Sequence, residues 1–109
     1  MVTQTPWGPS QTVEHIATGI IEYTTASHGG IHVASKLNKQ MPESIRVESG
    51  WYEEDVDWVF VVVNFPQHFT QQKYAEAREI FRNLLPDIYE RYYGIELKPG
   101  ESYMRDNDP

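Results

Sequence analysis

Hydrophobic and polar positions change their spacing along the chain, and each change predicts a different element. From Gln11 to Ala26, β-branched and aromatic residues form two runs separated by Ala17-Thr18-Gly19, which is typical of a β-hairpin. From Ile31 to Met41, apolar residues recur at offsets of three or four, which predicts a short helix ended by Pro42. Between these elements, we expect Ser27-His28-Gly29-Gly30 to form a turn, because two glycines can adopt positive φ.

The second half of the chain has the clearest helical pattern. Thr70 is a good N-cap, and apolar residues follow it at helical spacing up to Leu84, with charged residues on the other side. A second short helix is predicted over Asp87–Tyr93, with Pro86 before it and Gly94 in the position that favours a left-handed residue.

Two segments between these elements are less regular. Glu43–Glu48 alternates like a short strand or extended link, followed by a Ser49-Gly50 turn. Residues 51–65 fit two structures, because their β-branched and aromatic residues favour a buried strand while the acids that begin at Glu53 suit the first turn of a helix. We favour a helix over Glu53–Asn64 and leave the strand open.

These elements predict an α+β fold, in which an N-terminal β-hairpin or small antiparallel sheet packs against C-terminal helices. At 109 residues the chain suits one domain, residues 1–109, and 13% aromatic residues can supply its core. The absence of cysteine excludes disulfides, thiolate zinc sites and a cysteine nucleophile. We expect no membrane association, because no apolar run approaches the ~18 residues of a span, and no secretory signal.

Charge is concentrated in one stretch of the sequence. The net charge is −7, and residues 48–57 contain five acids and no Lys or Arg. Such a segment repels phosphates, so we expect no direct nucleic-acid binding, and it suits a basic protein surface. These acids are Glu48, Glu53, Glu54, Asp55 and Asp57.

Several residues could carry chemistry, and each also has a structural interpretation. His28 could act as a general base or metal ligand with Glu54 or Asp57 as its carboxylate partner, or it could simply belong to a turn. In a helix, Glu53 and Asp57 would share a face, and the acids could hold Mg²⁺ or Mn²⁺ or form a solvated patch. His28 and His32 would have metal-ligand spacing only if the turn continued the helix.

Other chemistry is disfavoured. The phosphate-loop, dinucleotide-binding and nucleophile-elbow motifs are missing from the sequence. The tyrosines could stack on bases, but no basic groove surrounds them, so we expect them to pack in the core or on the surface. We expect no cofactor. The tyrosines in question are Tyr89, Tyr92, Tyr93 and Tyr103.

Four motifs in order resemble a family of small uncharacterised proteins carried by phages, plasmids and other mobile elements. The motifs are Thr5–Pro9, Thr24–Gly30, Trp51–Trp58 and Pro99–Tyr103, so the resemblance spans nearly the whole chain. It supplies no active site. It implies a bacterial, mobile-element context, in which small acidic accessory proteins often inhibit host defence.

The resemblance and the charge together lead to one main functional hypothesis. We expect an inhibitor in the bacterial cytoplasm that binds the basic nucleic-acid-binding surface of a host defence protein, such as a CRISPR effector or restriction complex. Glu53, Glu54, Asp55 and Asp57 would meet Lys or Arg there, and the apolar anchors would be Trp51, Tyr52 or Trp58. The alternatives are a small metal-dependent or histidine-based hydrolase using His28 with Glu54 or Asp57, and a homodimeric module.

Overall fold

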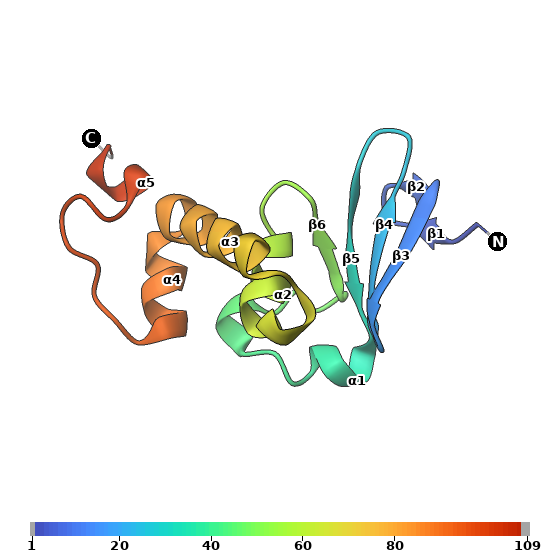
Figure 1. The fold of residues 1–109 in the computed structure, drawn as a ribbon, viewed down its shortest axis with the longest axis horizontal. Helices are drawn as coiled ribbons and strands as arrows, with labels where there is room; N and C mark the ends of the chain where they lie inside the picture. Colours follow the sequence, from blue (N-terminus) through green and yellow to red (C-terminus); the bar gives the residue numbers. More distant parts are fainter. Residues whose placement is uncertain (1, 108–109) are drawn as a thin grey trace.

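The computed structural model describes residues 2–107, which form two sheets and a set of helices (Figure 1). A two-stranded hairpin pairs β1 (Gln4–Thr5) with β2 (Gly8–Pro9). The main sheet is antiparallel with strand order β3-β4-β5-β6. Its strands are β3 (Thr12–Ala17), β4 (Ile20–Thr24), β5 (Gly29–Val33) and β6 (Trp51–Glu53).

The α-helices lie mostly on one side of the main sheet, and all but α1 follow its last strand in the sequence (Figure 1). The α-helices are α1 (Ser35–Asn38), α2 (Trp58–Asn64), α3 (Gln71–Leu84), α4 (Pro86–Tyr93) and α5 (Tyr103–Asp106). Two 3₁₀ turns are η1 (Glu43–Ile45) and η2 (Pro66–His68). The predicted α+β fold, with an N-terminal antiparallel sheet packed against later helices, is therefore confirmed. The molecule is elongated, with extents of 48 × 28 × 26 Å.

Elements with strong local signals agree with the sequence. The predicted hairpin is β3 and β4, with Gly19 at a φ of 84° in its turn. The Thr70 hydroxyl caps α3 by accepting a hydrogen bond from the Lys73 backbone N–H at 3.0 Å. Gly94 ends α4 in the left-handed conformation at a φ of 66°.

The predicted turn at Ser27–Gly30 and the predicted helix over Ile31–Met41 are largely wrong. Gly29 and Gly30 begin strand β5, and only Ser35–Asn38 is helical. Gly30 is needed for close packing and not for a turn, because a Cβ there would lie 2.4 Å from the Trp7 ring. Ile31 has helical spacing relative to the apolar residues that follow it. The pairing of its segment with β4 and β6 nevertheless makes this segment a strand.

The ambiguous segment 51–65 contains both of the expected structures in succession. Trp51–Glu53 forms β6, a turn follows, and α2 occupies Trp58–Asn64. The prediction of a helix is right for α2 and wrong for Glu53–Asp57. The acids therefore lie at the end of a strand and in a turn. The alternating segment that was expected to be extended begins instead with η1.

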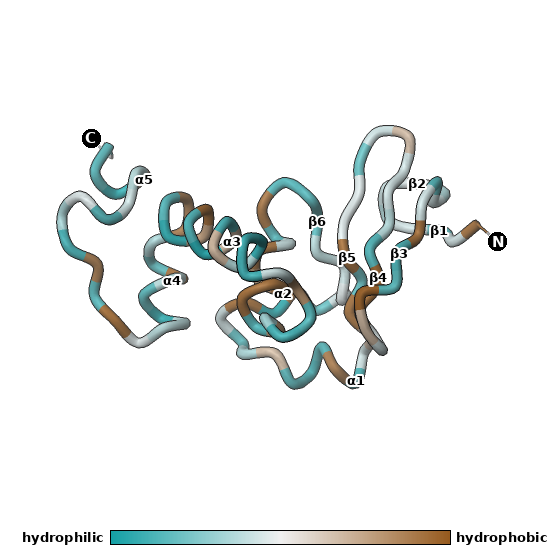
Figure 2. The backbone as a smooth tube through the Cα atoms, in the orientation of Figure 1, coloured by the Kyte–Doolittle hydropathy of each residue, from teal (hydrophilic) through white to brown (hydrophobic). Residues whose placement is uncertain are grey.

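Helix α2 forms the centre of the hydrophobic core. Its residues Val59–Val63 are all buried, so the helix has no polar face along this stretch. It contacts β5 and β6 on one side and α3 on the other. Figure 2 shows hydrophobic residues gathered in α2 and in the adjacent parts of β4 and β5. Within residues 2–107, no helix is long and apolar enough to cross a membrane.

Tyr52 anchors β6 to the segment that carries α1. Its side chain is fully buried, and its hydroxyl donates to Asn38 Oδ1 at 2.6 Å and accepts from the Val47 backbone N–H at 3.0 Å. The Asn38 amide in turn donates to the Val47 carbonyl at 2.8 Å. These bonds satisfy polar groups that folding removes from water.

Replacing this hydroxyl should destabilise the protein. Tyr52→Phe leaves the Asn38 carbonyl and the Val47 N–H without their partner, so we expect a loss of about 1–3 kcal/mol in the free energy of unfolding. Urea denaturation measures the loss. Tyr103→Phe, at an exposed position on α5, is the matched control and should change stability little. Equal stability of the Tyr52 and Tyr103 variants would contradict the structural role.

Candidate functional site

Three chain segments that are distant in sequence meet at one end of β5. The Trp7 ring, from the β1–β2 hairpin, lies edge-on to the His28 ring at 5.5 Å and to the Trp51 ring at 5.7 Å. The Trp51 ring also packs against the His32 ring at 4.4 Å. Because side chains alternate along a strand, this aromatic cluster lies on the sheet face opposite to the one that packs against α2.

His28 lies between two carboxylates at the edge of this cluster. Its Nε2 is 3.5 Å from Glu53 Oε2, and its Nδ1 is 3.4 Å from Glu54 Oε1. His28, Glu53 and Asp55 each offer one ligand atom, and these atoms lie within 4.8 Å of one another. We call Glu53, Glu54 and Asp55 the acidic rim. Its arrangement is compatible with a cation or with a basic group from outside.

The backbone explains how the acidic rim is positioned. The Glu54 N–H donates to the Gly29 carbonyl at 3.0 Å, which continues the pairing of β5 with β6 beyond the last strand residue. Glu53 and Glu54 therefore point to opposite faces of the sheet, and His28 at its end reaches both. The side chains of Glu53 and Glu54 are 43% and 50% exposed, so both remain accessible from water.

The other predicted acids lie in different surroundings. Asp57 does not share a helix face with Glu53, because Glu53 belongs to β6 and Asp57 precedes α2. Burial raises the pKa of Asp57, and the Glu53 carboxylate raises it further. Glu48 lies before β6 and pairs with Arg46 at 3.7 Å. Three of the five acids in residues 48–57 therefore lie together in the acidic rim, and Glu48 and Asp57 do not belong to it.

The predicted aromatic anchors differ in exposure. Tyr52 is wrong as an anchor, because it is fully buried and hydrogen-bonded inside the protein. Trp51 is partly buried within the aromatic cluster, and Trp58 is partly buried at the start of α2. The Lys73 ammonium lies 4.4 Å above the Trp58 ring, a cation–π contact. Trp7, which sequence analysis did not select as an anchor, packs against the His28 ring at 5.5 Å.

The condition under which His28 and His32 would share a metal ion, a turn that continues the helix, is not met. His28 precedes β5 and His32 lies within it, and four extended residues span roughly 13 Å. The two residues therefore lack the helical spacing that a shared metal ion would use. Burial lowers the pKa of His32, whose ring packs on Trp51.

A cleft on the opposite face of the sheet was not predicted from the sequence. It has a volume of about 560 Å³ and lies between the strands and the start of α3. We call it the sheet–helix cleft. Its apolar walls include Ile16, Ile31, Trp58 and Phe69. Its polar groups are Glu14, Glu22, Glu54, His68, Thr70 and Lys73.

Two of these carboxylates face each other across a strand pair. Glu14 on β3 is directly opposite Glu22 on β4. Burial raises the pKa of Glu22, the Glu14 carboxylate raises it further, and Lys73 lowers it. Like charges placed directly opposite are unfavourable in a sheet. The predicted hairpin contained this pair, and working out its register would have revealed it.

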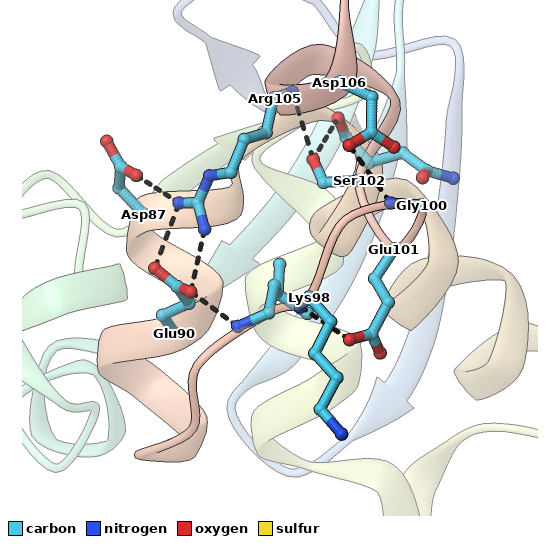
Figure 3. A network of polar contacts seen from close by, with 10 residues as sticks. Asp87, Glu90, Lys98, Gly100, Glu101, Ser102, Arg105 and Asp106 are labelled. Atoms are coloured by element: carbon cyan, nitrogen blue, oxygen red, sulfur yellow. Dashed lines mark hydrogen bonds and ion pairs between the residues drawn. The ribbon is translucent and has the colours of Figure 1, made fainter.

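The C-terminal motif Pro99–Tyr103 lies at the opposite end of the molecule from the main sheet (Figure 1) and belongs to a network of polar contacts (Figure 3). The Ser102 hydroxyl donates to the Asn83 carbonyl at 3.3 Å and accepts from the Arg105 N–H at 3.4 Å, capping α5. The Arg105 guanidinium pairs with Asp87 and with Glu90 on α4. Its hydrogen bond lowers the pKa of Glu90. The charges of Asp87 and Glu90 are therefore neutralised within the chain.

Comparison with known proteins identifies the family. The whole chain, residues 1–109, matches the family described as a domain of unknown function (DUF7007), and the protein belongs to it. No curated protein and no solved structure matches the chain significantly. The resemblance to an uncharacterised family is thus confirmed, and the chemistry of the site has to be argued from its own geometry.

The half-buried position of Glu22, opposite Glu14, makes the stability of the protein depend on pH. The pKa of Glu22 is raised above its ordinary value of 4.5, so the folded state binds this proton more tightly than the unfolded state. The resulting stabilisation is fully present below that ordinary value and is lost as pH rises through the folded-state pKa. Glu22→Gln should therefore melt a few degrees higher than the wild type at neutral pH, and the gain should vanish in acid.

Thermal unfolding from about pH 4 to pH 8 tests this expectation. Glu79→Gln, at an exposed position on α3, is the control and should follow the wild-type curve throughout. A Glu22→Gln variant that is less stable than the wild type at neutral pH would contradict an unfavourable environment for the Glu22 carboxylate.

Proposed function

We propose that this protein is encoded by a mobile element and inhibits a defence system of the host. Its acidic rim would bind a basic surface of a host defence protein. One observation carries the proposal. Within residues 2–107, no Lys or Arg of the chain forms an ion pair with Glu53, Glu54 or Asp55. By contrast, Arg105 neutralises the acids of α4 and Arg46 pairs with Glu48.

Charge that a chain leaves unpaired is available to a partner. Carboxylates grouped around His28 attract Lys and Arg side chains and speed the encounter with a basic surface. This attraction weakens as salt screens the charges. The partly exposed Trp7 and Trp51 rings beside them offer the apolar contact that interface centres use. In a bacterial host, the surfaces with matching charge include those with which defence proteins hold nucleic acid. The proposed setting is the cytoplasm of that host.

Charge reversal at the rim tests this proposal. The double variant Glu53→Lys with Asp55→Lys should lose inhibition and weaken partner binding by roughly tenfold or more. Inhibition is measured as the plating efficiency of a phage on bacteria that carry an active restriction or CRISPR system. Binding is measured by recovery of the partner from their lysate at low and high salt.

A matched variant distinguishes an effect of the acidic rim from an effect of the net charge of the protein. Glu76→Lys with Glu79→Lys makes the same change in charge on the exposed face of α3 and should behave as the wild type. If expression of the wild-type protein does not change the plating efficiency of the phage, the protein does not inhibit that defence system. Partner recovery that is insensitive to salt and tolerates the rim reversal contradicts the binding surface.

A second candidate function is favoured by the position of His28. A histidine that lies 3.4 Å from one carboxylate and 3.5 Å from another is an arrangement that histidine-based and metal-dependent hydrolases use. The partner carboxylates would be Glu54, as expected, and Glu53 in place of Asp57, because within residues 2–107 no ion pair joins His28 to Asp57. Metal ligands would be His28, Glu53 and Asp55.

Metal binding can be measured without knowing a substrate. If this candidate is right, Mn²⁺ or Zn²⁺ should raise the melting temperature by several degrees, because a ligand of the folded state stabilises it. His28→Ala should abolish the rise, and His15→Ala, at an exposed position on β3, should retain it. No rise with either ion, or an equal rise in the His28 variant, contradicts a metal site here.

A further inference from the structure

The sheet–helix cleft is formed mainly by residues that the proposed function does not use. Its volume of about 560 Å³ falls in the range of pockets that hold small organic groups. The apolar walls come from three separate segments of the chain and include Ile31 from the sheet, Trp58 from α2 and Phe69 beyond η2. A group that enters this cleft can therefore bury an apolar stem of several carbons.

The polar groups of the cleft have a strong bias in charge. Glu14, Glu22 and Glu54 bring three carboxylates from three different segments of the chain. The chain supplies one Lys against them, Lys73, whose ammonium lies over the Trp58 ring. The site thus already accommodates one cation and retains an excess of negative charge. A second cation would relieve the repulsion between the carboxylates.

A guanidinium fits these groups better than an ammonium does. Its five N–H donors lie in one plane and can reach carboxylates on different strands at the same time. It is also more weakly hydrated, so it gives up water at a lower cost on entering a partly apolar cleft. Its alkyl stem would lie along the apolar walls, as long cationic side chains do on protein surfaces.

We propose that the sheet–helix cleft binds an alkylguanidinium group, with the cation among Glu14, Glu22 and Glu54 and the stem against Ile31 and Phe69. The inference deepens the proposed function and rests on it for its setting, in which an arginine side chain of the basic partner enters the cleft. The same chemistry is offered by a free alkylguanidinium molecule. Glu54 lies in both the cleft and the acidic rim, so the two surfaces are continuous.

The test is an NMR titration of the full chain, labelled with ¹⁵N, using n-butylguanidinium as the probe. We expect saturable shifts at the Trp58 indole N–H and at the backbone amides of Thr70 and Lys73. Its neutral isostere n-butylurea, which has the same shape and no charge, should cause no saturable shift. Failure of n-butylguanidinium to saturate these signals, or equal binding of the urea, overturns the proposal.

Two variants give opposite expectations. Glu22→Gln should weaken binding at least threefold, because it removes a carboxylate that contacts the cation. Lys73→Gln should tighten binding a few-fold, because it removes the competing ammonium and frees the Trp58 ring. Lys36→Gln on α1 and Glu79→Gln on α3 are charge-matched controls and should bind as the wild type does. Weaker binding by Lys73→Gln overturns the proposal, since loss of a competing positive charge must favour a cation that the cleft carboxylates hold.

The sources of the cation are distinguished by a further arm. N-acetyl-arginine amide, which presents the side chain as a protein does, should bind as well as n-butylguanidinium if the partner supplies an arginine. Weaker binding by the amide favours a free small molecule. If n-butylguanidinium binds the cleft but the charge reversal at the rim leaves inhibition intact, only the proposed function is rejected. Absent cleft binding with inhibition lost on rim reversal rejects only this inference.

Discussion

Close approach of chain segments at Gly29 and Gly30 determines the geometry of both candidate sites. A Cβ on Gly30 would lie 2.4 Å from Trp7 and 2.5 Å from the Tyr52 carbonyl, and one on Gly29 would lie 2.8 Å from the Tyr23 carbonyl and 3.1 Å from Glu54 Oε2. The absence of both side chains lets the N-terminal hairpin cover one face of β5 while the carboxylate of Glu54 approaches at its end. His28, which immediately precedes Gly29, is thereby held between Glu53 and Glu54.

Glu54 connects the two surfaces electrostatically. It contacts His28 at the acidic rim, lines the sheet–helix cleft and contributes to the raised pKa of Glu22. A positive group that binds on either side reduces the negative potential felt on the other. Occupation of the rim and of the cleft should therefore not be independent events, and a partner with several basic side chains could engage both surfaces through one shared carboxylate.

Local signals in the sequence were sufficient for some elements and not for others. The Thr70 cap and Gly94 act through their own neighbours, so α3 and α4 could be placed from the sequence. The role of Gly30 depends on Trp7, more than twenty residues away, so its glycine was misinterpreted as a turn former. The acidic rim was found by composition, but its contact with His28 arises from β5–β6 pairing, which no local pattern specifies. The sheet–helix cleft needed both the hairpin register and the position of α3.

Acids at the two ends of the molecule differ in how the chain pairs their charge. At the C-terminal end, Arg105 binds Asp87 and Glu90, which fastens α5 to α4 (Figure 3). At the sheet, Glu14 faces Glu22 directly although such a pair destabilises a hairpin. Sequences that fold well avoid local conflicts of this kind, and those that remain tend to lie at functional sites. Since one Lys or Arg in place of Glu14 would remove the conflict, repulsion at this position argues that the negative charge of the cleft serves binding and not folding.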